Sequence, residues 1–453
     1  MERLSVLDAG FLQVEDSDPR VSLAIGSVTI LEGPAPDFEE FTTVLGGRLA
    51  AAPRLRQVVR THPLDLEPPH WADVDELDLG HHLRRVALPA PGGDAELFDL
   101  VSEIIERRLD RNYPLWECWL VEGLADDRWA LIVKLHHAVA DGVSATAMMA
   151  ALNDDDGTTG SFATHLHEAH ETEHPSLLSR ISLNPLDWGK AAWELSAGAA
   201  DLAIQTVRGS VTIVGDMVRP APESSLNGPV GSLRRYRAVR VPIADIRAIA
   251  HAFDATFNDV ALAAVTHGYR QVMLNRGESP RPDSLRTLIP VSVRDTAALD
   301  TPDNRVSLML PLLPVDLQTP LEQLKTLRRR MRRAKSSGQR QAGANVVDVA
   351  NRFLPFPLTA WTVRAVSRLP QRNIAGLATN VPGPREQVRM LGRTVVAMLP
   401  IPPLAVRLRI GVAMLSYADD LTFGILADYD SNPDLDLLAE GIESAVADLA
   451  RQV

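Results

Sequence analysis

The sequence predicts an α/β protein of two domains, and three observations lead to that prediction. The chain has 453 residues, more than one hydrophobic core usually holds. Residues 1–150 alternate short apolar runs with segments of helical periodicity. The same alternation resumes at about residue 232, after a polar tract and a long apolar segment. Strands and helices that alternate in both halves are typical of α/β domains.

The N-terminal portion contains apolar runs that predict strands and three-to-four periodicity that predicts helices. Two of the runs flank Ala125-Asp126-Asp127-Arg128, which predicts a hairpin. The expected strands are 22–31, 118–122 and 129–135, and the expected helices are 37–52, 96–110 and 144–152, with Ser144 as the cap of the last.

A polar tract at 153–160 predicts the first linker. The histidines that follow it predict either a metal-binding tract or a solvated loop; they are His165, His167, His170 and His174. Residues 186–218 predict an apolar helix that packs in the core, covers the active-site side or lies against a membrane. We therefore divide the chain into 1–152, a linker and crossover helix at 153–231, and 232–453.

The C-terminal portion repeats the mixed pattern. The expected helices are 243–252, 258–275, 321–336 and 434–452, and the expected strands are 284–293, 305–313, 407–417 and 421–429, the last two forming a hairpin around 418–420. The helix at 321–336 is basic, which suits a solvated face, acidic lipid or a cofactor phosphate.

Composition excludes several classes of protein. A net charge of −12 argues against nucleic acid as a general partner, because phosphate binding needs a basic face. Cys118 is the only cysteine, so we expect no disulfide and a reducing, cytoplasmic location. The N-terminus lacks the apolar core of a signal peptide, and no run of 18 apolar residues predicts a membrane span. We expect a soluble protein, at most peripheral on a membrane.

The run His136-His137-Ala138-Val139-Ala140-Asp141-Gly142 carries the strongest chemical signal. It directly follows the strand expected at 129–135, so two imidazoles stand where a strand ends. An imidazole titrates near neutral pH and can take a proton from a hydroxyl and return one to a leaving group. Asp141 could brace the loop, and Gly142 permits a turn or a close approach. The run therefore predicts a general base at the end of a strand.

Other interpretations of this run stay open. A histidine after a strand is often a surface or core residue, and a His pair with Asp could hold zinc or iron. No Cys or Glu stands at ligand spacing around the pair. The spacing of His136 and Asp141 also resembles that of glycerol-phosphate acyltransferases. The run alone leaves the kind of acyltransferase undecided.

Further segments, in order along the chain, resemble one family. They are Leu4 to Leu12, Pro114-Leu115-Trp116, the His run, Asn258-Asp259, Pro290 to Arg294 and Thr379 to Pro384. Together they resemble the bacterial wax ester synthase/diacylglycerol acyltransferase family. This family belongs to the CoA-dependent acyltransferases, with chloramphenicol acetyltransferase and peptide-synthetase condensation domains. The resemblance covers nearly the whole chain.

The resemblance implies two chloramphenicol-acetyltransferase-like α/β lobes around a central tunnel, with the His run at their interface. Acyl-CoA would enter from one side and the lipid alcohol from the other. His137 matches the family's catalytic base, and His136 would position the loop, assist binding or be structural. Asp141 matches a structural, salt-bridging residue, and Gly142 would keep the tunnel open.

The other motif residues carry weaker expectations. Asn258 either donates toward the substrate carbonyl or caps its helix. Asp259 supports the fold or lies beside substrate, and Ser292 is a second candidate oxyanion donor. Pro114, Leu115 and Trp116 are expected to shape the substrate interface, as is the loop expected around 379–382.

We expect an acyl-CoA-dependent O-acyltransferase that esterifies diacylglycerol to triacylglycerol. The alternatives are a wax ester synthase that uses fatty alcohols, a carrier-protein-dependent acyltransferase and an inactive lipid-binding relative. No metal or other cofactor is expected, since acyl-CoA is a co-substrate, and membrane or lipid-droplet contact would be peripheral. The Pro-rich stretch at 399–405 departs from the tunnel wall expected for the family, which bears on chain length and acceptor size.

Overall fold

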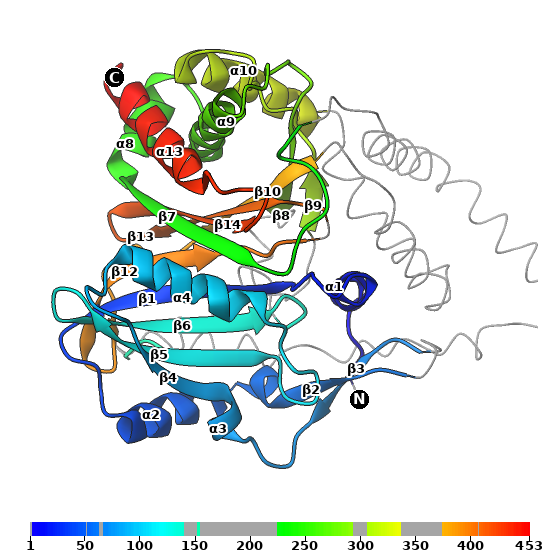
Figure 1. The fold of residues 1–453 in the computed structure, drawn as a ribbon, viewed down its shortest axis with the longest axis vertical. Coiled ribbons are helices and arrows are strands. Elements are labelled where there is room, and N and C mark those ends of the chain that lie inside the picture. The colour runs from blue at the N-terminus through cyan, green and yellow to red at the C-terminus, as the bar shows by residue number, and fades with distance from the viewer. Residues whose placement is uncertain are drawn as a thin grey trace, which may run out of the picture.

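The computed structural model describes residues 2–50, 52–62, 67–139, 152–154, 224–292, 306–336, 374–405 and 407–453. These residues form an α/β protein with two sheets, one above the other, each with its own helices (Figure 1). The N-terminal lobe contains α1 (Val6–Ser17), β1 (Ala24–Glu32), α2 (Phe38–Ala50), a 3₁₀ turn (Pro53–Arg56), β2 (Gln57–Arg60), β3 (His70–Asp73), α3 (Leu79–His82), β4 (Leu83–Ala87), α4 (Asp94–Glu106), β5 (Trp116–Leu124) and β6 (Arg128–His136). Then follow β7 (Arg234–Pro242), α8 (Ile243–Ala252), α9 (Phe257–Asn275), β8 (Arg286–Ser292), β9 (Val306–Met309), α10 (Pro320–Ser336), β10 (Ile374–Pro382), β11 (Arg389–Met390), β12 (Arg393–Ile401), β13 (Ile410–Tyr417), β14 (Asp420–Asp428) and α13 (Leu435–Ala450).

The N-terminal sheet has the strand order β11-β12-β1-β6-β5-β4. The predicted hairpin is confirmed, since β5 and β6 pair antiparallel. Alternate side chains of β6 enter different cores: Leu131, Val133 and Leu135 pack with α2, while Ala130 and Ile132 pack with α4. On the α4 side, the buried Lys134 donates to the carbonyl oxygen of Ile104 at 2.8 Å, near the end of that helix.

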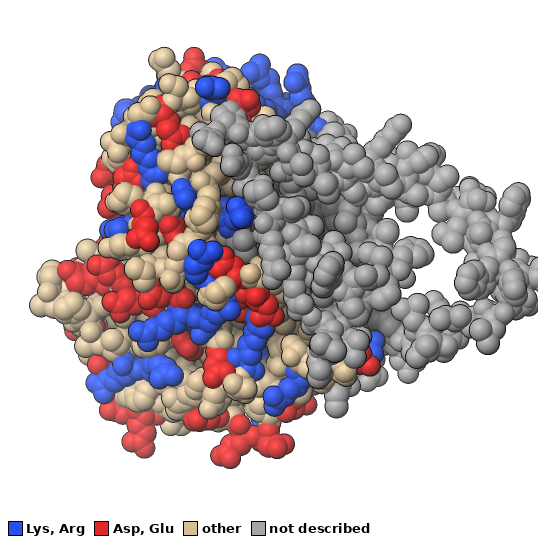
Figure 2. Space-filling model, turned by 45° about the vertical axis from the view of Figure 1, so that its right-hand side comes forward, with Lys and Arg blue, Asp and Glu red and all other residues tan. Residues whose placement is uncertain are grey.

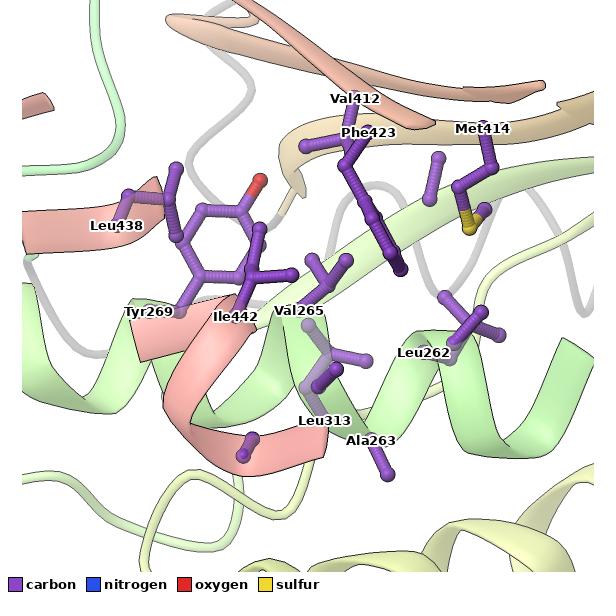
Figure 3. Packing of buried hydrophobic residues seen from close by; sticks show 14 of the residues in the cluster. Leu262, Ala263, Val265, Tyr269, Leu313, Val412, Met414, Phe423, Leu438 and Ile442 are labelled. Carbon is purple, nitrogen blue, oxygen red and sulfur yellow. The ribbon is translucent and has the colours of Figure 1, made fainter. Parts of the chain in front are cut away.

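The C-terminal sheet has the order β7-β14-β13-β10-β8-β9, and α8, α9, α10 and α13 lie on its far side from the other lobe (Figure 1). Apolar side chains of α9 and α13 pack against β13 and β14 (Figure 3); those labelled include Leu262, Val265, Tyr269, Val412, Met414, Phe423, Leu438 and Ile442. Gly268 and Gly441 let α9 and α13 approach, because a Cβ on Gly441 would lie 2.7 Å from the Cα of Gly268. The two-lobe architecture expected from the sequence is therefore confirmed.

One strand from the C-terminal half of the chain belongs to the N-terminal sheet, which the sequence does not indicate. Strand β12, at residues 393–401, leaves the C-terminal half of the chain and pairs antiparallel with β1 in the N-terminal sheet. The Pro-rich stretch at 399–405 begins within this strand and packs in the apolar cluster between the lobes. Residues 232–453 thus contribute to both sheets, and the division of the chain at 231/232 does not follow sheet membership.

The contact between the sheets is closest where β14 meets β12. A Cβ on Gly424 would lie 1.8 Å from the carbonyl oxygen of Pro400, so only glycine lets the strands lie this close. The same carbonyl accepts a 2.9 Å hydrogen bond from the hydroxyl of Tyr236 on β7. The buried guanidinium of Arg234 donates across the lobes to the carbonyl oxygen of Arg20 at 2.6 Å. Both hydrogen bonds join the lobes, and in both the acceptor is a backbone carbonyl oxygen.

One expectation about a motif segment is wrong. Residues 379–382 do not form a loop but end β10, an interior strand parallel to both β13 and β8. Glycine, asparagine and a final proline, which strands disfavour, make the strand hard to predict from the sequence. Its neighbours on both sides supply the pairing that its composition does not predict. The strand expected at 284–293 is confirmed as β8, which residues 290–292 end. The expectations for 144–151, for the histidines at 165–174 and for 186–218 lie outside the described residues.

Basic and acidic side chains are interspersed over the face in Figure 2. In the part of the chain that the structure describes, no helix combines the length and apolar character needed to cross a bilayer.

Candidate active site

The His run begins at the last residue of β6 and is held by backbone hydrogen bonds on both sides. The N–H of His136 donates to the carbonyl oxygen of Leu115, just before β5, at 3.0 Å. The N–H of His137 donates to the carbonyl oxygen of Leu23, just before β1, also at 3.0 Å. A turn follows, in which the N–H of Val139 donates to the carbonyl oxygen of His136 at 2.9 Å. The loop therefore starts from a backbone position fixed by two neighbouring strands.

His137 is half-buried, and its ring packs against Phe11 of α1 with 4.1 Å between ring centroids. Figure 1 shows α1 beside the ends of β1 and β6, at the level where the two lobes meet. The base predicted from the sequence thus has an aromatic wall on one side. Phe11 was part of a family motif in the sequence, but its contact with the histidine was not predicted.

His136 is buried and held within the fold. Its Nδ1 accepts a 3.1 Å hydrogen bond from the N–H of Ala138, so Nδ1 carries no proton. Its Nε2 lies 3.6 Å from Oε2 of Glu15 on α1. A neutral ring then carries its proton on Nε2, directed toward the carboxylate. These contacts favour the structural role among those considered for His136.

Glu15 is a buried carboxylate that the sequence analysis missed. It accepts from the Arg111 guanidinium at 2.8 Å and from the N–H of Leu23 at 3.2 Å. Burial alone would raise the pKa of the Glu15 carboxyl, but the His136 ring and the Arg111 guanidinium outweigh it and lower the pKa to about 2. Glu15 is therefore ionised at neutral pH, in a pocket where only 3% of the side chain is exposed.

The lowered pKa of Glu15 predicts that the folded chain loses stability at acid pH. Because the pKa of Glu15 is lower in the folded chain than its ordinary 4.5, its stabilisation is complete above pH 4.5 and is lost as pH falls toward 2. At about 1.36 kcal/mol per pKa unit, the difference is on the order of 3 kcal/mol. Glu15→Gln should therefore flatten the acid limb of stability between these pH values, measured by urea unfolding at several pH values. A variant with the same acid limb as the wild type would contradict this account of Glu15.

Pro114, Leu115 and Trp116 are buried and support the His run rather than line an open surface. Leu115 supplies the carbonyl oxygen that fixes His136, as described above. The indole N–H of Trp116 donates to the carbonyl oxygen of Leu55 at 2.9 Å, and its ring stacks on His82 with 4.2 Å between centroids. These contacts place Trp116 and Leu115 in the packing behind the His run, and the expectation that the three residues shape the substrate interface stays a prediction.

Asn258 and Asp259 stand in the first turn of α9, and the expectation that Asn258 caps this helix is wrong. The N-cap is Thr256, whose hydroxyl accepts from the N–H of Asp259 at 3.2 Å. The Asp259 carboxylate accepts from the N–H of Thr256 at 2.9 Å and completes a capping box. Asp259 thus supports the fold, whereas Asn258 is exposed and free of a capping role.

Asn258 is instead paired with a residue on another element. Its Oδ1 accepts a 2.5 Å hydrogen bond from Nδ2 of Asn380, near the end of β10. Because Oδ1 is occupied, the amide N–H₂ of Asn258 is the group left to donate to a substrate oxygen. Ser292 is the last residue of β8, which runs parallel to β10, so it lies at the same edge of the sheet. The structure therefore brings Asn258, Asn380 and Ser292 to one edge.

This edge and the His run border the same apolar cluster. The cluster includes Trp116 and Leu135 near the His run and Leu415 at the end of β13. Val139, two residues after His137, and Val381, next to Asn380, pack against it from the two lobes. A neighbour of the predicted base and a neighbour of Asn380 thus pack against one apolar cluster.

The remaining candidates are settled by burial or lie beyond the described residues. Cys118 is fully buried, and burial raises the pKa of its thiol, so it offers no thiolate nucleophile. Asp141 and Gly142 lie outside the described residues. Within those residues, no group of three or more His, Cys, Asp or Glu side chains is placed to hold a metal ion.

Comparisons with known proteins agree with this architecture. Residues 4–261 match the wax ester synthase/diacylglycerol acyltransferase catalytic domain, and residues 303–450 match the C-terminal domain of the same family. A Mycobacterium tuberculosis protein named as a probable diacylglycerol O-acyltransferase, tgs1, is 50% identical over 99% of this chain and 96% of its own. A second M. tuberculosis protein named for the same activity is 40% identical over 99% of this chain and 91% of its own.

Solved structures show the same fold. The wax ester synthase/diacylglycerol acyltransferase from Marinobacter aquaeolei is 24% identical, with a TM-score of 0.68 over 100% of this chain and 99% of its own. The first condensation domain of the calcium-dependent antibiotic synthetase is 16% identical, with a TM-score of 0.63 over 99% and 96%. The two-lobed fold and the matched family domains are those of an acyltransferase. The chain belongs to the wax ester synthase/diacylglycerol acyltransferase family.

Proposed function

We propose that this protein is an acyl-CoA-dependent diacylglycerol O-acyltransferase in which His137 is the general base. The observation that carries the proposal is 50% identity to the M. tuberculosis tgs1 protein over nearly both whole chains. The unbroken run from His136 to Gly142 and the packing of the His137 ring against Phe11 of α1 support it.

The reaction would proceed in one direct transfer. As the acceptor hydroxyl oxygen attacks the thioester carbonyl carbon, a ring nitrogen of His137 takes the hydroxyl proton. The carbonyl oxygen gains negative charge, and the Asn258 amide is the donor proposed to stabilise it. When the C–S bond breaks, the imidazolium returns the proton to the departing thiolate. The products are triacylglycerol and CoA, with no acyl group left on the protein.

This chemistry asks for no metal or further cofactor, because the imidazole supplies both proton transfers and acyl-CoA brings the activated acyl group. The apolar region between the lobes, bordered by Val139 and Val381, is where acyl chains would lie, and a tunnel through it is part of the proposal. The acceptor is a membrane lipid, so we propose peripheral contact with the inner membrane face or with lipid inclusions from the cytoplasmic side.

Wax ester synthesis is the second candidate, because the family and the Marinobacter structure carry both activities in their names. A competition assay distinguishes the two acceptors: purified protein receives palmitoyl-CoA with equal dioleoylglycerol and hexadecanol, and the products are resolved by mass spectrometry. We expect triacylglycerol to exceed wax ester. Wax ester in excess would make the second candidate the main activity. No product from folded protein would overturn the proposal in favour of a carrier-dependent or lipid-binding protein.

A further inference from the structure

Helix α1 contacts both histidines of the His run through one face. Phe11 packs against the His137 ring at 4.1 Å, and Glu15, four residues later, faces the His136 ring at 3.6 Å. Residues four apart lie on the same side of a helix, so α1 presents an aromatic ring and a carboxylate to adjacent residues of the loop.

The Glu15 carboxylate is itself firmly held. One oxygen accepts from the N–H of Leu23 at 3.2 Å, and the other accepts from Arg111 at 2.8 Å. The backbone of the same helix end is tied down by Arg108, whose Nη2 donates to the carbonyl oxygen of Glu15 at 2.5 Å. These partners hold the Glu15 carboxylate in one position.

Two routes lead from this carboxylate to His137. Through the first, Glu15 faces Nε2 of His136, whose Nδ1 accepts from the N–H of Ala138 at 3.1 Å. The His136 side chain is thereby tied to the backbone on the far side of His137. Through the second, Glu15 holds the N–H of Leu23, and the carbonyl oxygen of Leu23 accepts from the N–H of His137 at 3.0 Å. Both routes converge on the backbone of the proposed base.

We propose that Glu15 is a positioning residue for acyl transfer: it fixes the tautomer of His136 and the backbone that presents His137. The inference rests on the proposed function, since it takes His137 as the base. A base displaced by about 1 Å can lose on the order of 10²-fold in rate, so a carboxylate that never touches substrate still controls turnover.

Kinetics of three variants test this role. Glu15→Ala should lower kcat by roughly 10- to 100-fold and leave KM for palmitoyl-CoA almost unchanged, because acceptor activation is impaired rather than binding. Glu15→Gln should give an intermediate kcat, since its single amide oxygen can take the place of Oε2 facing His136, whereas its amide nitrogen cannot accept from the N–H of Leu23. Asp16→Asn is the matched control, because Asp16 lies next to Glu15 on α1 and also pairs with Arg111, at 2.8 Å, but its side chain is 38% exposed. This variant should have wild-type kcat.

Nitrogen NMR of the histidine rings gives a readout that does not depend on activity. In wild-type protein with ¹⁵N-labelled histidine, the His136 signals, assigned with a His136→Gln sample, should show a proton on Nε2 and a bare Nδ1. In Glu15→Ala the ring should exchange between tautomers. If circular dichroism shows that Glu15→Ala does not fold, Glu15→Asp, one methylene shorter, takes its place with the same expectations.

Wild-type kcat in folded Glu15→Ala would overturn the inference, as would a fall in kcat with unchanged His136 signals. Its failure is distinguishable from failure of the proposed function. If wild-type protein forms no ester, or His137→Ala keeps full activity, the proposed function fails. The His136 ring signals then still decide whether Glu15 fixes the tautomer.

Discussion

Replacement of His137 by alanine is expected to lower kcat by roughly 10²- to 10⁴-fold, the usual span for loss of a general base. The remaining rate would come from binding and from donors such as Asn258. Stability should change little, because the side chain is half-buried and its backbone hydrogen bond to Leu23 does not depend on the imidazole. Initial rates of CoA release from palmitoyl-CoA with dioleoylglycerol, beside thermal unfolding of each protein, measure both effects.

The control for this variant is His251→Ala, at an exposed position on α8 of the other lobe. It should have the wild-type rate, which separates loss of the base from loss of any histidine. A His137→Ala protein that turns over at a near-normal rate would remove the base mechanism, even if triacylglycerol is the product.

Replacement of Gly424 by alanine is expected to destabilise the fold by roughly 3 kcal/mol, the upper part of the range for overpacked sites. The new Cβ would lie 1.8 Å from the carbonyl oxygen of Pro400 and 3.0 Å from the hydroxyl of Tyr236. The clashing atom is backbone, so no rotamer change relieves it. The strands β14 and β12 must separate, which also weakens the hydrogen bond from Tyr236 to Pro400.

Urea unfolding followed by tryptophan fluorescence measures this loss as a shift of the midpoint. The matched control is Gly47→Ala in α2, where a Cβ meets nothing within 4 Å and alanine is the better helix former by up to about 1 kcal/mol. That variant should unfold at the same or higher urea. A Gly424→Ala midpoint equal to that of the wild type would show that the lobes do not meet as closely as described.

Much of the fold could be predicted because its strands are buried and its helices are periodic. The apolar run 129–135 and its partner across Asp126 and Asp127 indicate β5 and β6, and their pairing confirms the hairpin. The predicted helix 243–252 coincides with α8. These elements carry their own local signals: continuous apolar residues, turn residues with positive φ, and three-to-four spacing.

Other elements depend on distant partners and leave weak local signals. Strand β12 ends in a proline-containing stretch, yet it is held by β1, more than 350 residues earlier in the chain. Strand β10 contains glycine and proline and is stabilised by parallel neighbours on both sides. The periodicity of apolar residues does not predict such pairings, because the contacts that stabilise them are made only after the chain has folded.

The candidate site shows the same contrast. His137 could be predicted because its residue type, its place after a strand and the neighbouring glycine all point to a base. Glu15 could not, because its partner Arg111 is 96 residues away and nothing in a lone glutamate indicates burial. Its helix, α1, did leave one signal: Ser5 precedes Asp8 by three residues and its hydroxyl caps the helix by accepting from the N–H of Asp8. The pairing of Asn380 with Asn258 was not predicted, because residues 379–382 were expected to form a loop.

The central claim is direct transfer of an acyl group from CoA to diacylglycerol with His137 as the base. Its most direct test is a rapid-quench experiment with enzyme in slight excess over palmitoyl-CoA, first without acceptor and then with dioleoylglycerol. The account predicts no CoA release and no gain in protein mass before the acceptor is added, and then CoA and triacylglycerol in equal amounts. In His137→Ala their formation should be slower by roughly 10²- to 10⁴-fold. Release of CoA before the acceptor, with palmitate attached to the protein, would contradict it.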